Sequence, residues 1–245
     1  MTVSEFSNGF DLLVSSYRRF RGFDQKEASD SVEFNEYEKS FYLTKAQEEL
    51  VLSLYNGRNS SLQSFEETEE LRRYLSGLVE EAELSPLTSP SGKPIGMESN
   101  SKFFTLPENL WFITYEAVDV TGQTCDRGLL EVVPVKQDEY HRIRKNPFRG
   151  ANDRRALRLD LSDNVVEIVS KYTVTEYYVR YLRKLRPIVL VDMPNGITVR
   201  GVSTVSECAL HEGLHQRILE MAVEMAMKSR VGMTSQQTQR SDNRE

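Results

Sequence analysis

Apolar residues in the first third of the chain recur every three or four positions, which is the period of one face of an α-helix. Ser4 is placed to cap the first helix, and Thr44 with Gln47 fits a capping box that opens the second. Gly57 is placed to end that second helix. The apolar faces of the two helices are Phe6, Phe10, Leu13 and Tyr17, and Ala46, Leu50 and Leu54.

Two further helices follow from the same period. Ser64 and Glu67 form a capping box for a third helix, and Pro86 lies just beyond its end. A long C-terminal helix is predicted from near Leu210 to near Ser229. The apolar faces are Leu71, Leu75, Leu78 and Ala82 in the third helix, and Leu214, Ile218, Met221, Ala222 and Met225 in the last.

Between these helices the pattern changes to that of β-strands. Residues 84–102 are rich in Pro, Ser and Gly and predict a loop, and a short helix fits 137–145. In 175–185 polar and apolar side chains mix on both faces, which favours a strand that meets a partner. Runs rich in β-branched and aromatic residues occupy 110–120, 129–135, 156–161, 164–171, 175–185 and 196–203.

The order helices, strands, helix predicts an α+β fold. We expect three N-terminal helices and the long C-terminal helix to form a bundle that carries an antiparallel β-sheet or sandwich as an insertion. The expected parts are a helical part (1–83), a loop (84–102), a β-rich part (103–205), a C-terminal helix packed on the helical part (206–230), and a tail (231–245) that is disordered or becomes an inter-subunit arm.

Composition and charge limit the classes of protein to which the chain can belong. The hydrophobic fraction of 39% is ordinary for a globular protein, and no apolar run is long enough for a membrane span. The net charge of −6 hides a division, because carboxylates dominate from about 24 to 83 whereas 142–158 is strongly basic. This division has two interpretations. The acidic and basic segments are either two solvated faces, or surfaces of opposite charge that meet between copies of the chain or lie near a polyanion.

One motif favours an enzyme. His211, Glu212 and His215 satisfy HExxH, in which two histidines one helical turn apart bind zinc and the glutamate acts as general base. No third ligand follows at a suitable distance, and Gly213 is unfavourable within a metal-binding helix. The fragment is more typical of a helix beginning, where Glu212 meets the positive end of the helix dipole. A zinc-dependent hydrolase is the alternative, and no cofactor is expected.

Several segments resemble ring proteins of the head–tail connector of crAss-like phages. They are EYEKSFYLTKAQEELVLSLYNG, DEYHRIRKNPFRG with ALRLDL, YYVRYLRKLRPIVL, and ECALHEGLHQRILEMAVEMAMKS. The resemblance covers about residues 34 to 228. One departure is Ala209-Leu210, which stands where the family usually has Pro before the histidine segment.

The resemblance implies a non-enzymatic virion protein, made in the host cytoplasm, with no membrane partner. It implies a ring of twelve copies that bridges portal and tail proteins, while DNA passes through without sequence-specific binding. We expect subunit or partner contacts at Arg142, Arg144, Arg149, Arg180 and Arg183. An acidic surface of Glu66, Glu67, Glu69 and Glu70 is expected to line the channel.

Overall fold

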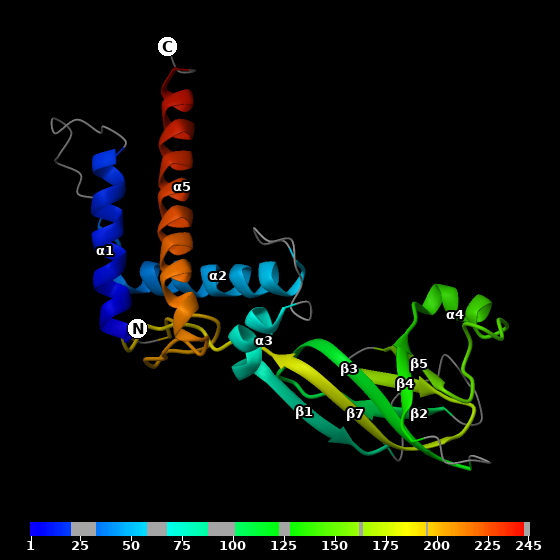
Figure 1. Ribbon diagram of the computed structural model, residues 1–245. Coiled ribbons are helices and arrows are strands. Elements are labelled where there is room, and N and C mark those ends of the chain that lie inside the picture. Colours follow the sequence, from blue (N-terminus) through cyan, green and yellow to red (C-terminus); the bar gives the residue numbers. More distant parts are fainter. Residues whose placement is uncertain are drawn as a thin grey trace. The chain divides into compact units, whose positions relative to one another are not determined.

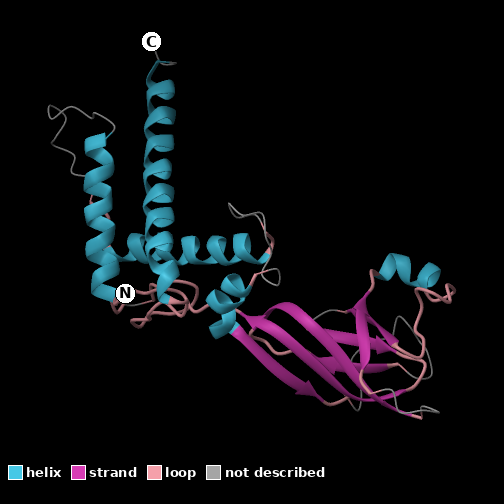
Figure 2. Ribbon diagram, viewed as in Figure 1, coloured by secondary structure: helices cyan, strands magenta, loops and turns pink. Residues whose placement is uncertain are grey.

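The chain folds into two compact units, which we describe separately. The computed structural model describes residues 1–20, 33–57, 68–87, 101–122, 128–161, 164–194 and 196–242. Met1–Leu78 and Leu185–Glu245 form the helical unit, and Val79–Lys184 form the β unit. The described residues therefore have the predicted α+β class, and Figure 2 shows the strands of the β unit together with a short helix that belongs to the same unit.

The helical unit is built around its C-terminal helix. This helix, α5, packs against both α1 and α2, and Figure 1 shows α2 crossing the other two rather than running beside them. Phe6, Phe10 and Val14 of α1 are buried, as are Ile218 and Ala222 of α5. The helices are α1 (Val3–Phe20), α2 (Glu36–Tyr55), α3 (Glu69–Leu75) and α5 (His215–Asp242).

The helix starts differ from those that the sequence predicts. At α1 the cap is Thr2, whose Oγ1 accepts from Glu5 N at 3.4 Å, so the Ser4 prediction is wrong. At α2 the cap is Asn35, which forms a capping box with Glu38. The predicted Thr44 box is wrong because eight residues of helix already precede Thr44.

Thr44 has a tertiary partner instead of a capping role. Its Oγ1 accepts from Ile188 N at 3.1 Å and donates to Ile188 O at 3.2 Å. Nearby, Ser40 Oγ accepts from Leu190 N, and the amide of Gln47 donates to Arg186 O. These buried bonds attach residues 186–190 to α2. The predicted end of α2 is confirmed, since Gly57 adopts φ 68°.

Three other boundaries are corrected. The third helix, α3, is only seven residues long, and after the 3-10 turn η2 (Ser76–Leu78) the chain enters a strand, so Ala82 is not helical. Ser64 and Glu67 lie outside the described residues. The strand predicted at 196–203 is a tight turn closed by a Val199–Val202 bridge. Finally, α5 continues to Asp242, beyond the predicted end near Ser229.

The β unit is one seven-stranded sheet with the order β1-β7-β3-β4-β5-β6-β2. All pairs among the described strands are antiparallel except β4–β5, which is parallel, so the predicted antiparallel sheet is confirmed apart from this pair. The crossover between those two strands contains the predicted short helix, α4 (Gln137–Ile143). The strands are β1 (Val79–Leu84), β2 (Lys102–Thr105), β3 (Leu110–Thr121), β4 (Leu130–Pro134), β5 (Arg155–Asp160), β6 (Val165–Val169) and β7 (Thr173–Arg183).

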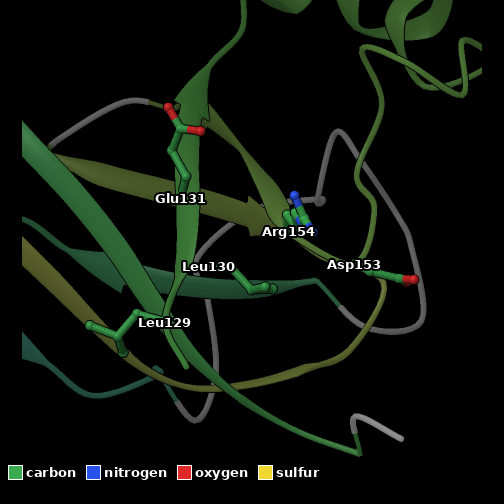
Figure 3. A pocket seen from close by; sticks show the side chains of 5 residues that line it. All are labelled: Leu129, Leu130, Glu131, Asp153 and Arg154. Carbon is green, nitrogen blue, oxygen red and sulfur yellow. The ribbon is translucent and has the colours of Figure 1, made fainter. Parts of the chain in front are cut away.

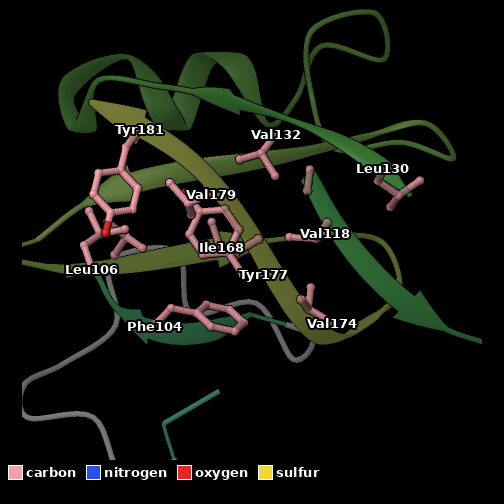
Figure 4. Packing of buried hydrophobic residues seen from close by; sticks show 12 residues of the cluster. Phe104, Leu106, Val118, Leu130, Val132, Ile168, Val174, Tyr177, Val179 and Tyr181 are labelled. Carbon is pink, nitrogen blue, oxygen red and sulfur yellow. The ribbon is translucent and has the colours of Figure 1, made fainter. Parts of the chain in front are cut away.

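The sheet encloses an apolar cluster that β7 crosses, as Figure 4 shows. Tyr177, Val179 and Tyr181 of β7 are buried in it, so the expectation of a partner-facing strand is wrong for this face. A second cluster holds α4 through the buried Tyr140, which packs with Leu157 of β5. Among the described residues, no helix is long and apolar enough to cross a membrane.

Candidate assembly surfaces

The HEGLH segment begins the C-terminal helix. His211 caps η3 (Glu212–Leu214), and its Nδ1 accepts from Gly213 N at 3.1 Å. Its ring lies against Tyr74 of α3, with the centroids 5.5 Å apart. A Cβ on Gly213 would come within 3.3 Å of both rings, so glycine allows this close approach.

His215, the other histidine of the motif, is buried at 4% exposure. Its Nε2 lies 3.0 Å from Leu210 O, its Nδ1 lies 2.7 Å from the Met1 amine, and its ring packs on Phe6. Burial lowers the pKa of His215 and favours the neutral ring. The described residues contain no group of three or more His, Cys, Asp or Glu that could hold a metal.

Three of the five predicted contact arginines gather around α4. Arg142 lies in its last turn and pairs with Glu139, while Arg144 and Arg149 lie in the exposed turn that follows. We call residues 144–150 the knob. Within it Phe148 is 85% exposed, the highest value among the large hydrophobic residues whose exposure the structure describes.

Phe148 was not predicted as a contact residue. The signal available in the sequence was an aromatic residue between two turn pairs, Asn146-Pro147 and Arg149-Gly150, in a basic run. An exposed aromatic side chain surrounded by arginine has the composition of an interface anchor.

The other two predicted arginines lie on β7, in the sheet itself. Arg183 Nε is 3.4 Å from Glu80 of β1, and both Arg180 and Arg183 are half-buried. Arg183 therefore joins neighbouring strands of its own unit. The five predicted contact arginines therefore lie in two places, three around α4 and two on the sheet.

A buried charge cluster also lies within the β unit. Arg158 Nη1 lies 2.5 Å from Glu116 Oε1, and the Tyr177 hydroxyl donates to Glu116 Oε2 at 2.5 Å. Desolvation raises the pKa of Glu116, although Arg158 and Tyr177 oppose that shift. Burial beside the carboxylate also raises the pKa of Tyr177. Because Glu116 of β3 binds both Arg158 of β5 and Tyr177 of β7, the cluster joins these three strands inside the unit.

The predicted acidic surface is described only in part. Glu69 and Glu70 are exposed in the first turn of α3, where they pair with Arg73 and the Tyr74 hydroxyl. Glu66 and Glu67 lie outside the described residues. Their predicted role in lining a channel stays a prediction.

Shallow hollows lie in the described residues of both units. In the β unit a hollow of ≈ 540 Å³ is lined by residues 129–131 and 153–154 (Figure 3). In the helical unit a second hollow, which we call the groove, measures ≈ 600 Å³. The residues of the groove used below are Val3, Glu36, Leu190, Val191, Val205 and Glu207.

The fold and its surfaces define a two-unit α+β protein whose exposed features suit assembly, and comparison with known proteins places it among the phage ring proteins. The chain belongs to the phage tail ring protein 3/4 family, which matches residues 1–239. It is similar to Ring protein 3 of Bacteroides phage crAss001, with 44% identity over 238 residues, covering 96% of this chain and 98% of that protein.

A second relative, Ring protein 4/5 of the same phage, is 32% identical over 235 residues and is covered at 92% in both chains. The predicted family is therefore confirmed. The chain is a structural ring protein of the crAss-like phage type and a component of the virion.

Proposed function

We propose that the chain is a ring subunit of the phage head–tail connector. Copies of it would form a closed ring, with twelve as the expected number, between portal and tail proteins and around the DNA channel. The observation that carries this proposal is the match to ring proteins over nearly the whole of both chains. A match that includes both units supports the same assembly role for the whole described fold.

The surfaces suit this role. Arg142, Arg144 and Arg149 lie together around α4, where they would contact another subunit or a connector partner. Arg180 and Arg183, which lie on the sheet, would support that unit and reach partners only with their exposed parts. Opposite charge on two surfaces of one chain guides copies into register, because attraction acts before the surfaces touch.

Glu69 and Glu70, with Glu66 and Glu67, would face the channel. Carboxylates repel the phosphates of DNA, so a lumen lined by them would let DNA pass without adhering. Exchanging Glu69 and Glu70 for lysine tests this role. We expect the assembled variant to retain duplex DNA in a salt-sensitive way, and equal behaviour of variant and wild type would contradict a channel position.

The ring itself is tested by measuring the mass of the purified chain alone and with the portal and tail proteins of the same phage. Mass photometry and negative-stain images should show closed rings of a single size, with twelve copies expected. A chain that stays monomeric at every concentration and binds neither partner would overturn the proposal.

A further inference from the structure

The knob is a rigid turn. The Asn146 side chain accepts from Phe148 N at 2.9 Å and from Arg149 N at 3.3 Å, and Asn146 O accepts from Gly150 N at 2.7 Å. Arg155 Nη1 donates to Phe148 O at 3.2 Å. A Cβ at Gly150 would lie 2.9 Å from Asn146 O, so the turn requires glycine there. Phe148 is thus held outward by bonded backbone.

The knob combines one aromatic ring with positive charge. Residues 144–150 include Arg144, Lys145 and Arg149 and no carboxylate. Aromatic and arginine side chains contribute the largest shares of binding energy at protein interfaces, and a preformed turn loses little entropy when it docks. The knob therefore fits a partner surface that is apolar at its centre and acidic at its rim.

The groove has this complementary composition. Val191 and Val205, which line it, are 44% and 47% exposed. Glu36 and Glu207 also line it, and Asp192 lies next to it, accepting from Val205 N at 2.8 Å. The nearby ammonium of Lys39 is buried and is matched by Asp11 and Glu36. The groove thus exposes apolar carbon within a negative rim.

We propose that the knob of one copy docks into the groove of the next copy, with Phe148 against Val191 and Val205 and the basic flank against Glu207. A closed ring needs two different surfaces on each copy that fit each other, because a single self-complementary patch would end at a dimer. The knob and the groove are such a pair, with opposite charge and matching apolar centres. This inference rests on the proposed ring function and names the contact that forms the ring.

Two variants of the full chain test the contact. Phe148→Ala removes the anchor and leaves the groove intact, whereas Val205→Arg adds bulk and positive charge to the groove and leaves the knob intact. Each variant alone should need a concentration at least about tenfold higher than wild type for half-assembly. Phe148 is exposed and Val205 half-exposed, so both variants should keep the wild-type circular dichroism and melting temperature.

Mixing the two variants gives the sharpest readout. The Val205→Arg copy can still insert its knob into the groove of the Phe148→Ala copy, but neither copy can extend the chain further. The mixture should therefore stop at heterodimers in native mass spectra. Leu12→Ala, a matched control that changes a 71% exposed apolar residue of α1 outside both surfaces, should assemble as wild type does.

The outcomes separate this inference from the ring function. Wild-type rings with unchanged assembly of Phe148→Ala would overturn the knob contact and leave the ring function standing. A wild type that never assembles, alone or with portal and tail proteins, would overturn both. If Phe148→Ala assembles normally but loses salt-sensitive binding to duplex DNA, the knob contacts DNA and the inference fails.

Discussion

At the scale of single residues, Arg158 and Glu116 form an ion pair with only 11% and 8% of their side chains exposed. A charge left alone in such a place is poorly solvated. We expect Arg158→Met to lower the free energy of unfolding by about 3–5 kcal/mol in urea denaturation. The double variant Arg158→Met/Glu116→Leu should recover most of the loss. Equal losses in the single and double variants would contradict the pairing.

His215 should make stability depend on pH. Its pKa is lowered from the usual 6.5 by burial, so the unfolded chain binds more protons than the folded one as the pH falls through that value. The free energy of unfolding should be at its full value above about pH 7. It should decrease as the pH falls below about 6.5. His215→Gln should reduce this slope, measured by chemical denaturation at a series of pH values.

The matched control is His141→Gln, which replaces an exposed imidazole on α4. A wild-type slope in the His215 variant would exclude the buried imidazole as the source of the pH dependence. The same protein preparation allows a metal analysis. Stoichiometric zinc that is lost in His215→Ala would contradict the structural role of the HEGLH segment.

At the scale of elements, α2 depends on two polar residues in different ways. Asn35→Ala removes the cap and should lower the free energy of unfolding by about 1 kcal/mol. Thr44→Val leaves both backbone groups of Ile188 without their buried partner and should lower it by about 1–3 kcal/mol. Thermal and urea unfolding of the two variants compare these effects. A neutral Thr44→Val would show that the two Thr44 bonds add nothing to the hold of residues 186–190 on α2 beyond the Ser40 and Gln47 bonds and apolar packing.

At the scale of the whole molecule, assembly should weaken as salt rises. The knob carries Arg144, Lys145 and Arg149, while the groove carries Glu36 and Glu207, and mobile ions screen attraction between exposed charges. Raising the ionic strength from about 0.05 M to about 0.5 M should increase the concentration for half-assembly on the order of tenfold. Mass photometry across a salt series measures this. An unchanged midpoint would indicate a contact governed by apolar burial.

At this scale, the features of the fold that the local sequence pattern predicts differ from those that it does not predict. The α+β class, the helix at 137–143, the end of α2 at Gly57 and most of the strands follow from periodicity and turn residues, because these depend on neighbours along the chain. The ring-protein family also follows from sequence, through segments that resemble it from about 34 to 228. These features need no knowledge of distant contacts.

Tertiary structure decided the features that depend on partners far away in the sequence. Val79–Leu84 has a helix-like pattern but forms a strand because β7 supplies its hydrogen bonds. Thr44 serves Ile188, 144 residues away, rather than a helix start. The motif at 211–215 begins a helix, because its second histidine is buried against α1. Local pattern therefore determined the elements and the family, while long-range hydrogen bonding and burial decided what the ambiguous segments became.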